Sequence, residues 1–290
     1  MIALVQLLIK YAFLEPFGVT FGLDALGISL LITATICIAA AGNIINDIYD
    51  IETDFVNKPN KIIIGNSISE KTAYNLFIIL NIIGVGIGYY LSNSVDKNAF
   101  FSLFVIISAL LYIYATYLKR TLLIGNIVVS ILVALSIIIV GIFELLPTLT
   151  PENRLTQLTF FKIILDYALM AFILNLIREI AKDIEDIDGD YKAEMNTLPI
   201  AIGRERASYV LFVLTLIPLF TIAYYTINSL YTNLTAVIYF LVFIIAPLIY
   251  ISIKAFSAKT KKEHHHISSM LKLVMFFGIL SLLLYKYILL

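Results

Sequence analysis

Charged residues are scarce in this sequence, cysteine occurs once, and neither sign of charge is in excess. Charged residues make up 14% of the 290 positions and hydrophobic residues 61%, and the mean hydropathy is +0.97. Soluble domains have about a quarter charged and about half apolar residues, so the composition indicates an integral membrane protein. The net charge of zero gives no indication of a nucleic-acid partner. Cys37 alone cannot form an internal disulfide, and its apolar surroundings predict a small buried side chain.

Long apolar runs fill most of the chain, and no basic leader typical of a signal peptide precedes them. A membrane helix needs ~20 mostly apolar residues. Nine runs are candidates, at about residues 2–22, 25–45, 72–91, 98–118, 123–146, 159–180, 207–227, 233–253 and 269–289. Lys10, Glu15 and Pro16 interrupt the first run, and the proline should kink it, so eight spans is the alternative count. We predict an all-α polytopic membrane protein with about nine helices around a central cavity.

The basic residues are distributed unevenly between the connections of these predicted spans. Most of the 20 lysines and arginines lie between spans two and three, four and five, six and seven, or eight and nine. By the positive-inside rule these connections face the cytoplasm. We therefore predict a protein of the cell membrane with a cytoplasmic amino terminus and an external carboxyl terminus.

Two acid clusters follow predicted spans two and six, and they share the spacing i, i+3, i+7. The first is Asp47, Asp50 and Asp54, and the second is Asp183, Asp186 and Asp190. This spacing places the three carboxylates on one face of a helix that continues past the membrane. Because four spans separate the clusters, both should open on the cytoplasmic side. The repetition indicates one domain, 1–290, built from two related halves of about 1–146 and 147–290.

Like charges at this spacing repel one another, so we expect a cation to offset them. Hard oxygen ligands without nearby histidine or cysteine favour Mg²⁺ or Ca²⁺ over Zn²⁺, and Mg²⁺ is usually shared with substrate phosphates. Basic residues accompany the acids: Lys58, Lys61, Lys119, Arg120, Arg178 and Lys182. Acids for a metal and bases for phosphate oxygens predict a diphosphate site at the membrane surface. The apolar spans beneath it would hold a hydrocarbon tail, and loss of diphosphate from an isoprenoid would leave an allylic cation for a nucleophile to capture.

The acids have alternative interpretations that the pattern favours less. Either cluster alone would most simply be a solvated flank of a membrane helix, whereas a matched pair favours a site. An ion-coupled transporter or channel also carries intramembrane acids, but near the midpoints of spans and not at their ends. A soluble-type terpene synthase fold uses similar aspartate-rich helices around Mg²⁺, but nine long apolar spans exclude it.

At these residues the sequence resembles the UbiA superfamily of intramembrane prenyltransferases. The first family signature, N-D-x-x-D-x-x-x-D, corresponds to Asn46, Asp47, Asp50 and Asp54, and NKPNK follows it. The second, D-x-x-D-x-x-x-D, corresponds to Asp183, Asp186 and Asp190. Nine helices, signatures after the second and sixth, and a cytoplasmic cap formed by those loops also fit the family. The resemblance covers nearly the whole chain.

The resemblance implies transfer of a prenyl group from an isoprenyl diphosphate to a lipophilic acceptor, with two Mg²⁺ ions. It implies that Asn46, Asp50 and Asp54 hold one metal and that Asp186 and Asp190 hold the other. Asp47 and Asp183 would bind metal, orient ligands or hydrogen-bond neighbours. Asp50, Asp186 and Lys119 would be catalytic. Lys119, in YLKR, would bind diphosphate, with help from Lys61, Arg178 and Lys182, which are alternatively ordinary cytoplasmic flanks.

The acceptor is less sharply indicated. REIAKDIEDIDGD followed by TLPIAIGR looks most like archaeal-type geranylgeranylglyceryl phosphate geranylgeranyltransferases, which attach the second chain of an ether lipid. Chlorophyll- and homogentisate-type members share the GD and TLP features, whereas members that prenylate 4-hydroxybenzoate usually carry a different second signature, so an aromatic or quinone-precursor acceptor remains the alternative. Arg204 and Arg206 would meet an acceptor phosphate or anchor headgroups. Family members usually begin with a polar segment bearing arginine and asparagine, whereas this chain starts in an apolar run, so residues of an acceptor pocket are expected to be missing.

Two further patterns are expected to be structural. The glycines of GVGIG, Gly84, Gly86 and Gly88, lie inside the third span, where close helix packing is expected in place of phosphate binding. The run His264–His266 lies in the lysine-rich stretch KTKKEHHH, which we expect to be a cytoplasmic loop in contact with lipid headgroups.

Overall fold

The computed structural model describes residues 1–59 and 62–289, and its regular elements are helices. The longer ones are α2 (Ala25–Tyr49), α4 (Glu70–Ser94), α5 (Phe101–Thr116), α6 (Ile124–Leu145), α7 (Arg154–Lys192), α9 (Arg204–Ser229), α11 (Ala246–Ser257) and α12 (Lys261–Leu280). The shorter ones are α1 (Ile2–Leu7), η1 (Leu8–Leu14), η2 (Glu15–Phe17), α3 (Ile51–Asn57), η4 (Asn98–Phe100), η5 (Leu118–Arg120), α8 (Leu198–Ile202), α10 (Leu234–Phe240), η6 (Leu241–Ile245), η7 (Ser281–Leu284) and α13 (Tyr285–Leu289). In the described residues, extended pairing is limited to one bridge between Ile64 and Ile68. The prediction of an all-α protein is confirmed.

Eight helical segments in the described residues are long and apolar enough to cross a membrane. They run Ala25–Tyr49, Glu70–Ser94, Asn98–Thr116, Ile124–Leu145, Arg154–Lys192, Arg204–Ser229, Leu234–Ser257 and Lys261–Tyr287, and correspond to the second to ninth predicted spans. The first predicted span forms a shorter helical segment, Ile2–Phe17, made of pieces of 6, 7 and 3 residues. It ends at Gly18, whose φ of 63° lies in the left-handed region that favours glycine. The described residues thus contain eight candidate spans, and the first predicted span stays a prediction.

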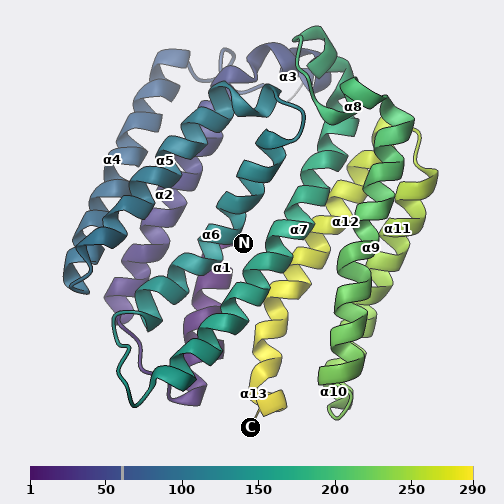
Figure 1. Cartoon of the computed structure of the whole chain (residues 1–290). Helices are drawn as coiled ribbons and strands as arrows, with labels where there is room; N and C mark the ends of the chain where they lie inside the picture. The colour runs from purple at the N-terminus through teal and green to yellow at the C-terminus, as the bar shows by residue number, and fades with distance from the viewer. Residues whose placement is uncertain (60–61, 290) are drawn as a thin grey trace.

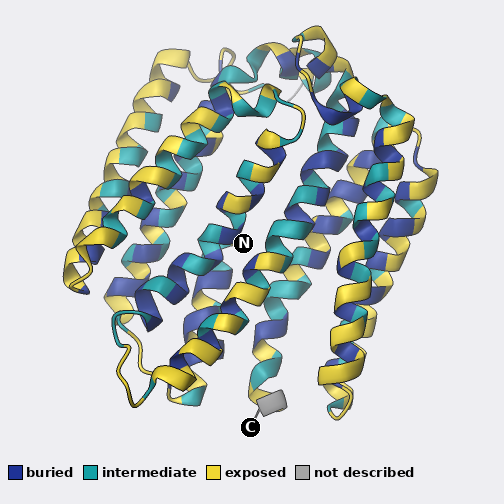
Figure 2. Ribbon diagram, viewed as in Figure 1, coloured by how far each residue is buried: buried dark blue, intermediate teal, exposed yellow. Residues whose placement is uncertain are grey.

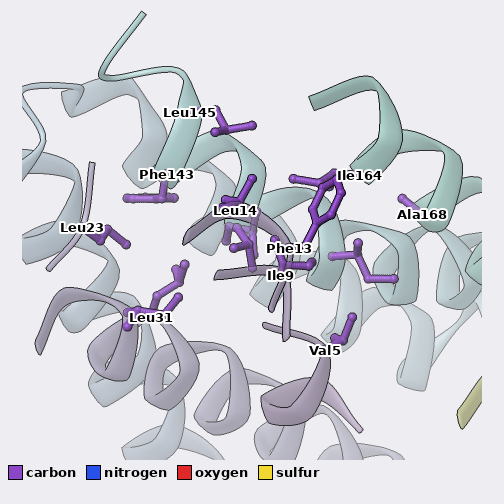
Figure 3. Packing of buried hydrophobic residues seen from close by; sticks show 14 of the residues in the cluster. Val5, Ile9, Phe13, Leu14, Leu23, Leu31, Phe143, Leu145, Ile164 and Ala168 are labelled. Carbon is purple, nitrogen blue, oxygen red and sulfur yellow. The ribbon is translucent and has the colours of Figure 1, made fainter. Parts of the chain in front are cut away.

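The amino-terminal segment packs into the interior of the bundle. Val5, Ile9, Phe13 and Leu14 are buried in one apolar core with residues of α2, α6 and α7, and Figure 3 shows Phe13 beside Ile164 of α7. Close packing of these side chains against neighbouring helices stabilises the segment through van der Waals contacts. The segment is therefore part of the folded core although it is short for a membrane span.

The two larger apolar cores of the described chain lie in different parts of the bundle, and a small third one joins Ile45 and Ile48 of α2 to Ile64, Ala73 and Ala115. The first involves mainly α1, α2, α6 and the start of α7, and the second involves the rest of α7 with α9, α11 and α12. In Figure 1, α6 and α7 run between the group of α2, α4 and α5 and the group of α9, α11 and α12. Large apolar side chains are exposed on the outer helices, such as Ile82, Phe220 and Ile227, and Figure 2 shows many exposed residues there. Such surfaces suit contact with lipid.

Close packing between α2, α4 and α5 depends on two glycines of GVGIG. A Cβ on Gly84 would lie 2.6 Å from Ile38 Cγ1, and one on Gly88 would lie 2.4 Å from the Phe104 ring. A Cβ on Gly86 would meet nothing within 4 Å. The packing interpretation is confirmed for Gly84 and Gly88, whereas Gly86 faces open space.

Four connections meet at one end of the bundle. Figure 1 shows α3 and α8 at this end and the carboxyl terminus at the other. The Asn196 amide after α7 donates to the Arg120 carbonyl of η5 at 2.9 Å. Lys261 Nζ, at the start of α12, donates to the Asn57 carbonyl of α3 at 3.0 Å. These four connections are the ones that contain most of the basic residues. They lie on one surface of the bundle, together with the final turns of α7.

Candidate functional site

The first acid cluster lies where α2 gives way to α3. Asp50 separates the two helices with φ −95° and ψ 0°, so the single uninterrupted helix expected from the sequence is broken there. The Asp50 amide still donates to the Asn46 carbonyl at 2.9 Å, and the Asp54 amide donates to the Asp50 carbonyl at 2.7 Å. Asn46 Nδ2 donates to Asp50 Oδ2 at 2.5 Å. The bend therefore keeps Asn46, Asp50 and Asp54 on successive turns.

The second acid cluster lies on the last turns of α7, which is one continuous helix of 39 residues. Asn57 at the end of α3 joins the clusters, because its Nδ2 donates to the Asp186 carbonyl at 3.0 Å and its Oδ1 accepts from the Gly189 amide at 3.1 Å. A Cβ on Gly189 would lie 2.3 Å from Asn57 Nδ2. The absence of a side chain at Gly189 therefore allows α3 to approach α7 closely.

Lysines from three different elements lie between the carboxylates. Lys58 Nζ donates to Asp186 Oδ2 at 2.7 Å, and Lys119 of η5 forms an ion pair with Asp50 Oδ1. Lys261 Nζ lies 3.8 Å from Asp186 Oδ1. These pairs join segments more than 60 residues apart in the chain, so the fold creates an alternating arrangement of acids and bases.

η5 is held against α6 at Gly125, which places Lys119 at the site. A Cβ on Gly125 would lie 2.6 Å from the Leu118 carbonyl oxygen and 2.8 Å from Lys119 Cα. Any larger residue at this position would push the turn away from α6. Gly125 therefore helps to position the Lys119 backbone.

The titration of two groups outside the spans reflects this arrangement. Burial raises the pKa of Asp54, the charges of Asp50 and Asp186 raise it further, and Lys58 and Lys119 oppose the rise. Burial alone would lower the pKa of Lys58, but its hydrogen bond to Asp186 and the charges of Asp186 and Asp54 raise it overall. Carboxylates of both clusters therefore interact through one shared field.

The oxygen atoms at the site suit a hard divalent cation. Asn46 Oδ1 and Asp186 Oδ1 are buried and have no hydrogen-bond partner. Carboxylate and amide oxygens are the ligands that Mg²⁺ prefers. Across residues 1–59 and 62–289, no three acidic, histidine or cysteine side chains are grouped tightly enough to hold a metal by themselves. Mutual repulsion separates the carboxylates, and the lysines pair with them instead. The residues fit a metal shared with substrate phosphates.

Other predicted site residues have different partners. Asp183 accepts from Asn126 Nδ2 of α6 at 2.7 Å. Arg178 and Lys182 both pair with the buried Glu179 carboxylate, at 2.6 and 3.0 Å. The hydrogen bond orients the Asp183 carboxylate toward α6. Glu179 partly neutralises the charges of Arg178 and Lys182, which pair with it and not with Asp186.

The remaining predicted residues are distributed around this region. Asp47 is exposed on the last turn of α2, and Asp190 is buried near the end of α7, where the charges of Asp186 and Asp50 act on it. Lys61 lies outside the described residues. Arg204 lies 3.6 Å from the exposed Asp188 and not at the acid clusters.

A cavity of about 700 Å³ lies among α1, α2, α5, α6, α7 and α12. Its lining is mainly aliphatic, and its polar members are Thr35, Asn43, Ser136, Asn175, Arg178 and Lys272. Asn43 lies one turn before Asn46 on α2, so the cavity reaches toward the acid clusters. The cavity can accommodate a hydrocarbon chain whose polar head lies at the acids.

Sequence reasoning missed Asn57 and Lys261 as site residues. Asn57 belongs to the NKPNK run, which offered a signal, whereas Lys261 was expected in a loop. A capping box between Thr260 and Glu263 instead starts α12 at Lys261. His264–His266 are consequently helical, which corrects the loop prediction, and His264 is buried with its Nε2 2.9 Å from Ser208 Oγ.

Comparison with known proteins gives a consistent result. The profile of the UbiA prenyltransferase family matches residues 12–286. A digeranylgeranylglyceryl phosphate synthase of Methanosphaera stadtmanae is 31% identical over 258 residues, which cover 87% of this chain and 86% of the relative. A solved structure of a digeranylgeranylglyceryl phosphate synthase superposes with a TM-score of 0.63 at 23% identity, covering 97% of this chain and 93% of the other. A UbiA homolog from Archaeoglobus fulgidus bound to GPP and Mg²⁺ gives a TM-score of 0.56 at 17% identity, covering 97% and 96%. These two likenesses show a shared fold.

Proposed function

The chain belongs to the UbiA prenyltransferase family, and we propose that it transfers a geranylgeranyl group from its diphosphate to geranylgeranylglyceryl phosphate in ether-lipid synthesis. The relative from Methanosphaera stadtmanae supports this acceptor, since its name describes a glyceryl phosphate with two geranylgeranyl groups. The Archaeoglobus homolog bound to GPP and Mg²⁺ supports a Mg²⁺-dependent prenyl diphosphate donor. Both substrates are lipids with charged heads, so they suit a site at a membrane surface.

One observation supports this function most directly. The acid clusters after α2 and near the end of α7 are joined by Lys58, Lys119 and Lys261 at one end of the bundle, beside an apolar cavity. Diphosphate needs cations, and an isoprenoid chain needs apolar walls. A transporter path would require acids near the span midpoints, whereas these acids lie at helix ends.

The reaction exchanges one carbon–oxygen bond for another. The bond between prenyl C1 and the diphosphate oxygen breaks, and its electron pair leaves with diphosphate. The acceptor hydroxyl oxygen forms a bond to C1, and the hydroxyl proton is released. Lys119 and Lys58 bind the departing phosphate oxygens, and the aliphatic cavity excludes water that would otherwise capture the allylic cation. Bound Mg²⁺ supplies further neutralisation of the diphosphate charge.

We assign the metal-holding residues by the contacts around them. Asn46, Asp50 and Asp54 would hold one Mg²⁺, and Asp186 and Asp190 would hold a second. Asn46 Oδ1 and Asp186 Oδ1, which are buried without a hydrogen-bond partner, support this division. Asp183 would act through its hydrogen bond to Asn126, and the exposed Asp47 would orient phosphate groups or metal-bound water.

We also propose a membrane arrangement for the fold. The connections at the acid site form a cytoplasmic cap, because the positively charged loops lie there. The segment Ile2–Phe17 would act as the ninth membrane helix by packing within the bundle, with the amino terminus toward the cytoplasmic side. The halves 1–146 and 147–290 would be pseudo-repeats, each ending a helix at one acid cluster.

A transfer assay tests the function. Purified protein in lipid nanodiscs would be given labelled geranylgeranyl diphosphate and, separately, geranylgeranylglyceryl phosphate, 4-hydroxybenzoate, homogentisate and a naphthoate. We expect labelling of geranylgeranylglyceryl phosphate that disappears with EDTA and returns with added Mg²⁺.

The panel also distinguishes the other acceptor classes. Labelling of an aromatic compound alone would replace the proposed acceptor with the aromatic or quinone-precursor class. Absence of transfer to every acceptor, with protein that binds the donor, would contradict the proposed substrate pair.

A further inference from the structure

The cavity contains two cations that the acid site does not use. Arg178 of α7 and Lys272 of α12 both line it, among side chains that are mainly aliphatic. Arg178 Nε is buried and has no hydrogen-bond partner. Among the described residues, no carboxylate lies within 4.0 Å of the Lys272 ammonium. A cavity meant only for hydrocarbon would not place such donors in its wall.

Lys272 lies in the field of the Arg178 charge, whereas Arg178 itself pairs with Glu179 at 2.6 Å. The charge of Arg178 acts on Lys272 more strongly than any other, and Glu179 and Glu185 oppose it more weakly. Glu179 is already shared between Arg178 and Lys182, and Glu185 lies 3.0 Å from His265 Nδ1. Like charges facing one cavity cost free energy unless an anion binds between them.

This cationic pair is separate from the donor site and adjacent to it. Lys58 and Lys119 pair with Asp186 and Asp50, whereas neither Arg178 nor Lys272 forms an ion pair with these acids in the described chain. Arg178 lies five residues before Asp183 on α7, and Asn43, which lines the same cavity, lies one turn before Asn46 on α2. A second anionic head bound at the cationic pair would therefore lie beside the donor diphosphate.

We propose that Arg178 and Lys272 form an anion subsite that binds the phosphate monoester head of the lipid acceptor. The proposal rests on the prenyl-transfer function and adds how the acceptor is selected. A phosphate monoester carries up to two negative charges and several acceptor oxygens, which match one ammonium and one guanidinium. The aromatic acceptors of the panel carry a single carboxylate charge, which matches the two cations less well than a phosphate monoester does. The subsite thus favours a phosphorylated acceptor, and it assigns to Arg178 a role different from donor binding.

Direct binding tests the subsite without the reaction. Wild-type protein in nanodiscs of zwitterionic lipid would be titrated with labelled geranylgeranylglyceryl phosphate and with geranylgeranylglycerol, in the absence of donor and Mg²⁺. We expect Lys272→Gln to weaken binding of the phosphorylated lipid about ten- to hundredfold and to leave binding of the alcohol unchanged. Lys262→Gln removes an exposed charge from the same helix and should change neither.

A second variant and a competitor distinguish the subsite from a packing role and from a headgroup site. Arg178→Gln should reproduce the loss, and Arg178→Lys should partly restore phosphate-dependent binding if the variant remains folded. Equal loss for the phosphorylated lipid and the alcohol would identify a packing role and overturn the proposal. Displacement of the ligand by phosphatidylglycerol as effectively as by unlabelled geranylgeranylglyceryl phosphate would identify a bilayer headgroup site and also overturn it.

The donor provides the final comparison. Labelled geranylgeranyl diphosphate should bind wild type and Lys272→Gln equally in the presence of Mg²⁺, whereas a matching loss would assign the cations to the donor. Acceptor binding is measured without turnover, so the binding result tests the subsite even if the transfer assay shows no activity. Transfer to geranylgeranylglyceryl phosphate with unchanged acceptor KM in Lys272→Gln would overturn the subsite alone.

Discussion

Asp186 has its two carboxylate oxygens in different surroundings. Oδ2 accepts from Lys58, whereas Oδ1 is buried without a hydrogen bond and has Lys261 Nζ 3.8 Å away, and the backbone carbonyl accepts from Asn57. A buried carboxylate oxygen without a hydrogen bond is unfavourable, so the position of Oδ1 at the meeting point of both clusters suits a ligand. Asp188, two residues later, is 70% exposed at its side chain and illustrates a solvated acid on the same helix.

Asp186→Asn tests this residue with little change in shape. The amide removes the negative charge needed for a metal and for Lys58, so we expect prenyl transfer to fall about 10²-fold or more. Initial rates at saturating donor and acceptor would measure the loss. Asp188→Asn, the matched control, should retain the wild-type rate. Equal activity of the two variants would remove Asp186 from the catalytic site.

Individual residues also show the limit of sequence reasoning. The acids were recognised because their spacing is local and because the same spacing follows both the second and the sixth predicted span. The contacts around them were not predicted, because the ion pair of Lys58 with Asp186 spans 128 positions and the hydrogen bond of Lys261 to the Asn57 carbonyl spans 204. Nothing in a single sequence states which lysine faces which acid across such distances.

At the scale of elements, the contact of α3 with α7 brings the acid clusters together. Asn57 and Gly189 form it through two hydrogen bonds and a close approach of side chain to backbone. The sequence predicted both helical acid faces, but not the break at Asp50 that redirects α3. That break depends on tertiary contacts that local propensity does not encode.

Gly189→Ala tests the docking of α3. The new Cβ would clash with Asn57, so we expect the Mg²⁺ concentration for half-maximal activity to rise about 10-fold or more. Alanine is the better helix former, so any loss arises from the contact. Gly86→Ala introduces the same change into α4 with nothing within 4 Å and should be neutral. Relief of the defect by Asn57→Ala in the double variant would confirm the clash, and a normal Mg²⁺ requirement in Gly189→Ala would refute it.

A buried ion pair ties the amino-terminal segment to α6. Lys10 Nζ lies 2.9 Å from Glu144 Oε1, both side chains are buried, and Glu144 Oε2 accepts from the Leu23 amide at 3.1 Å. Lys10 interrupts an apolar run in the sequence, and in the fold its buried charge is paired with the Glu144 carboxylate.

Removing one partner leaves a buried charge alone. We expect Glu144→Gln to lower the free energy of unfolding by about 3–5 kcal/mol, and the double variant Lys10→Met, Glu144→Leu to recover much of it. Thermal unfolding in detergent would measure both, with Glu152→Gln in the exposed α6–α7 loop as the control. A Tm of Glu144→Gln equal to that of the control would show that the pair contributes nothing to stability.

At the scale of the whole molecule, the arrangement of connections predicts the orientation in the membrane. The α3–α4 connection lies at the acid-site end and the α6–α7 connection at the opposite end, as Figure 1 shows. Asn66 and Glu152 are exposed in these two connections. If the acid site faces the cytoplasm, Asn66 lies on the cytoplasmic side of the membrane and Glu152 on the external side.

Cysteine labelling would measure this orientation. After Cys37→Ser removes the single native cysteine, Asn66→Cys and Glu152→Cys would be exposed to a membrane-impermeant maleimide in intact cells. We expect Glu152→Cys to be labelled and Asn66→Cys to be labelled only after lysis. The reverse pattern would place the acid site outside the cell.

The sequence by itself determined the membrane location, eight apolar helices of the bundle, the two acid clusters and their basic flanks. Hydropathy and spacing are short-range properties, and each can be read within a few helical turns. Only the tertiary structure decided that Lys58 and Lys119 lie between the clusters, that the first segment forms a short core helix, and that Arg178 and Lys272 line one cavity. These outcomes depend on packing between helices distant in the chain, where the free energy of burial and ion pairing is shared among many residues.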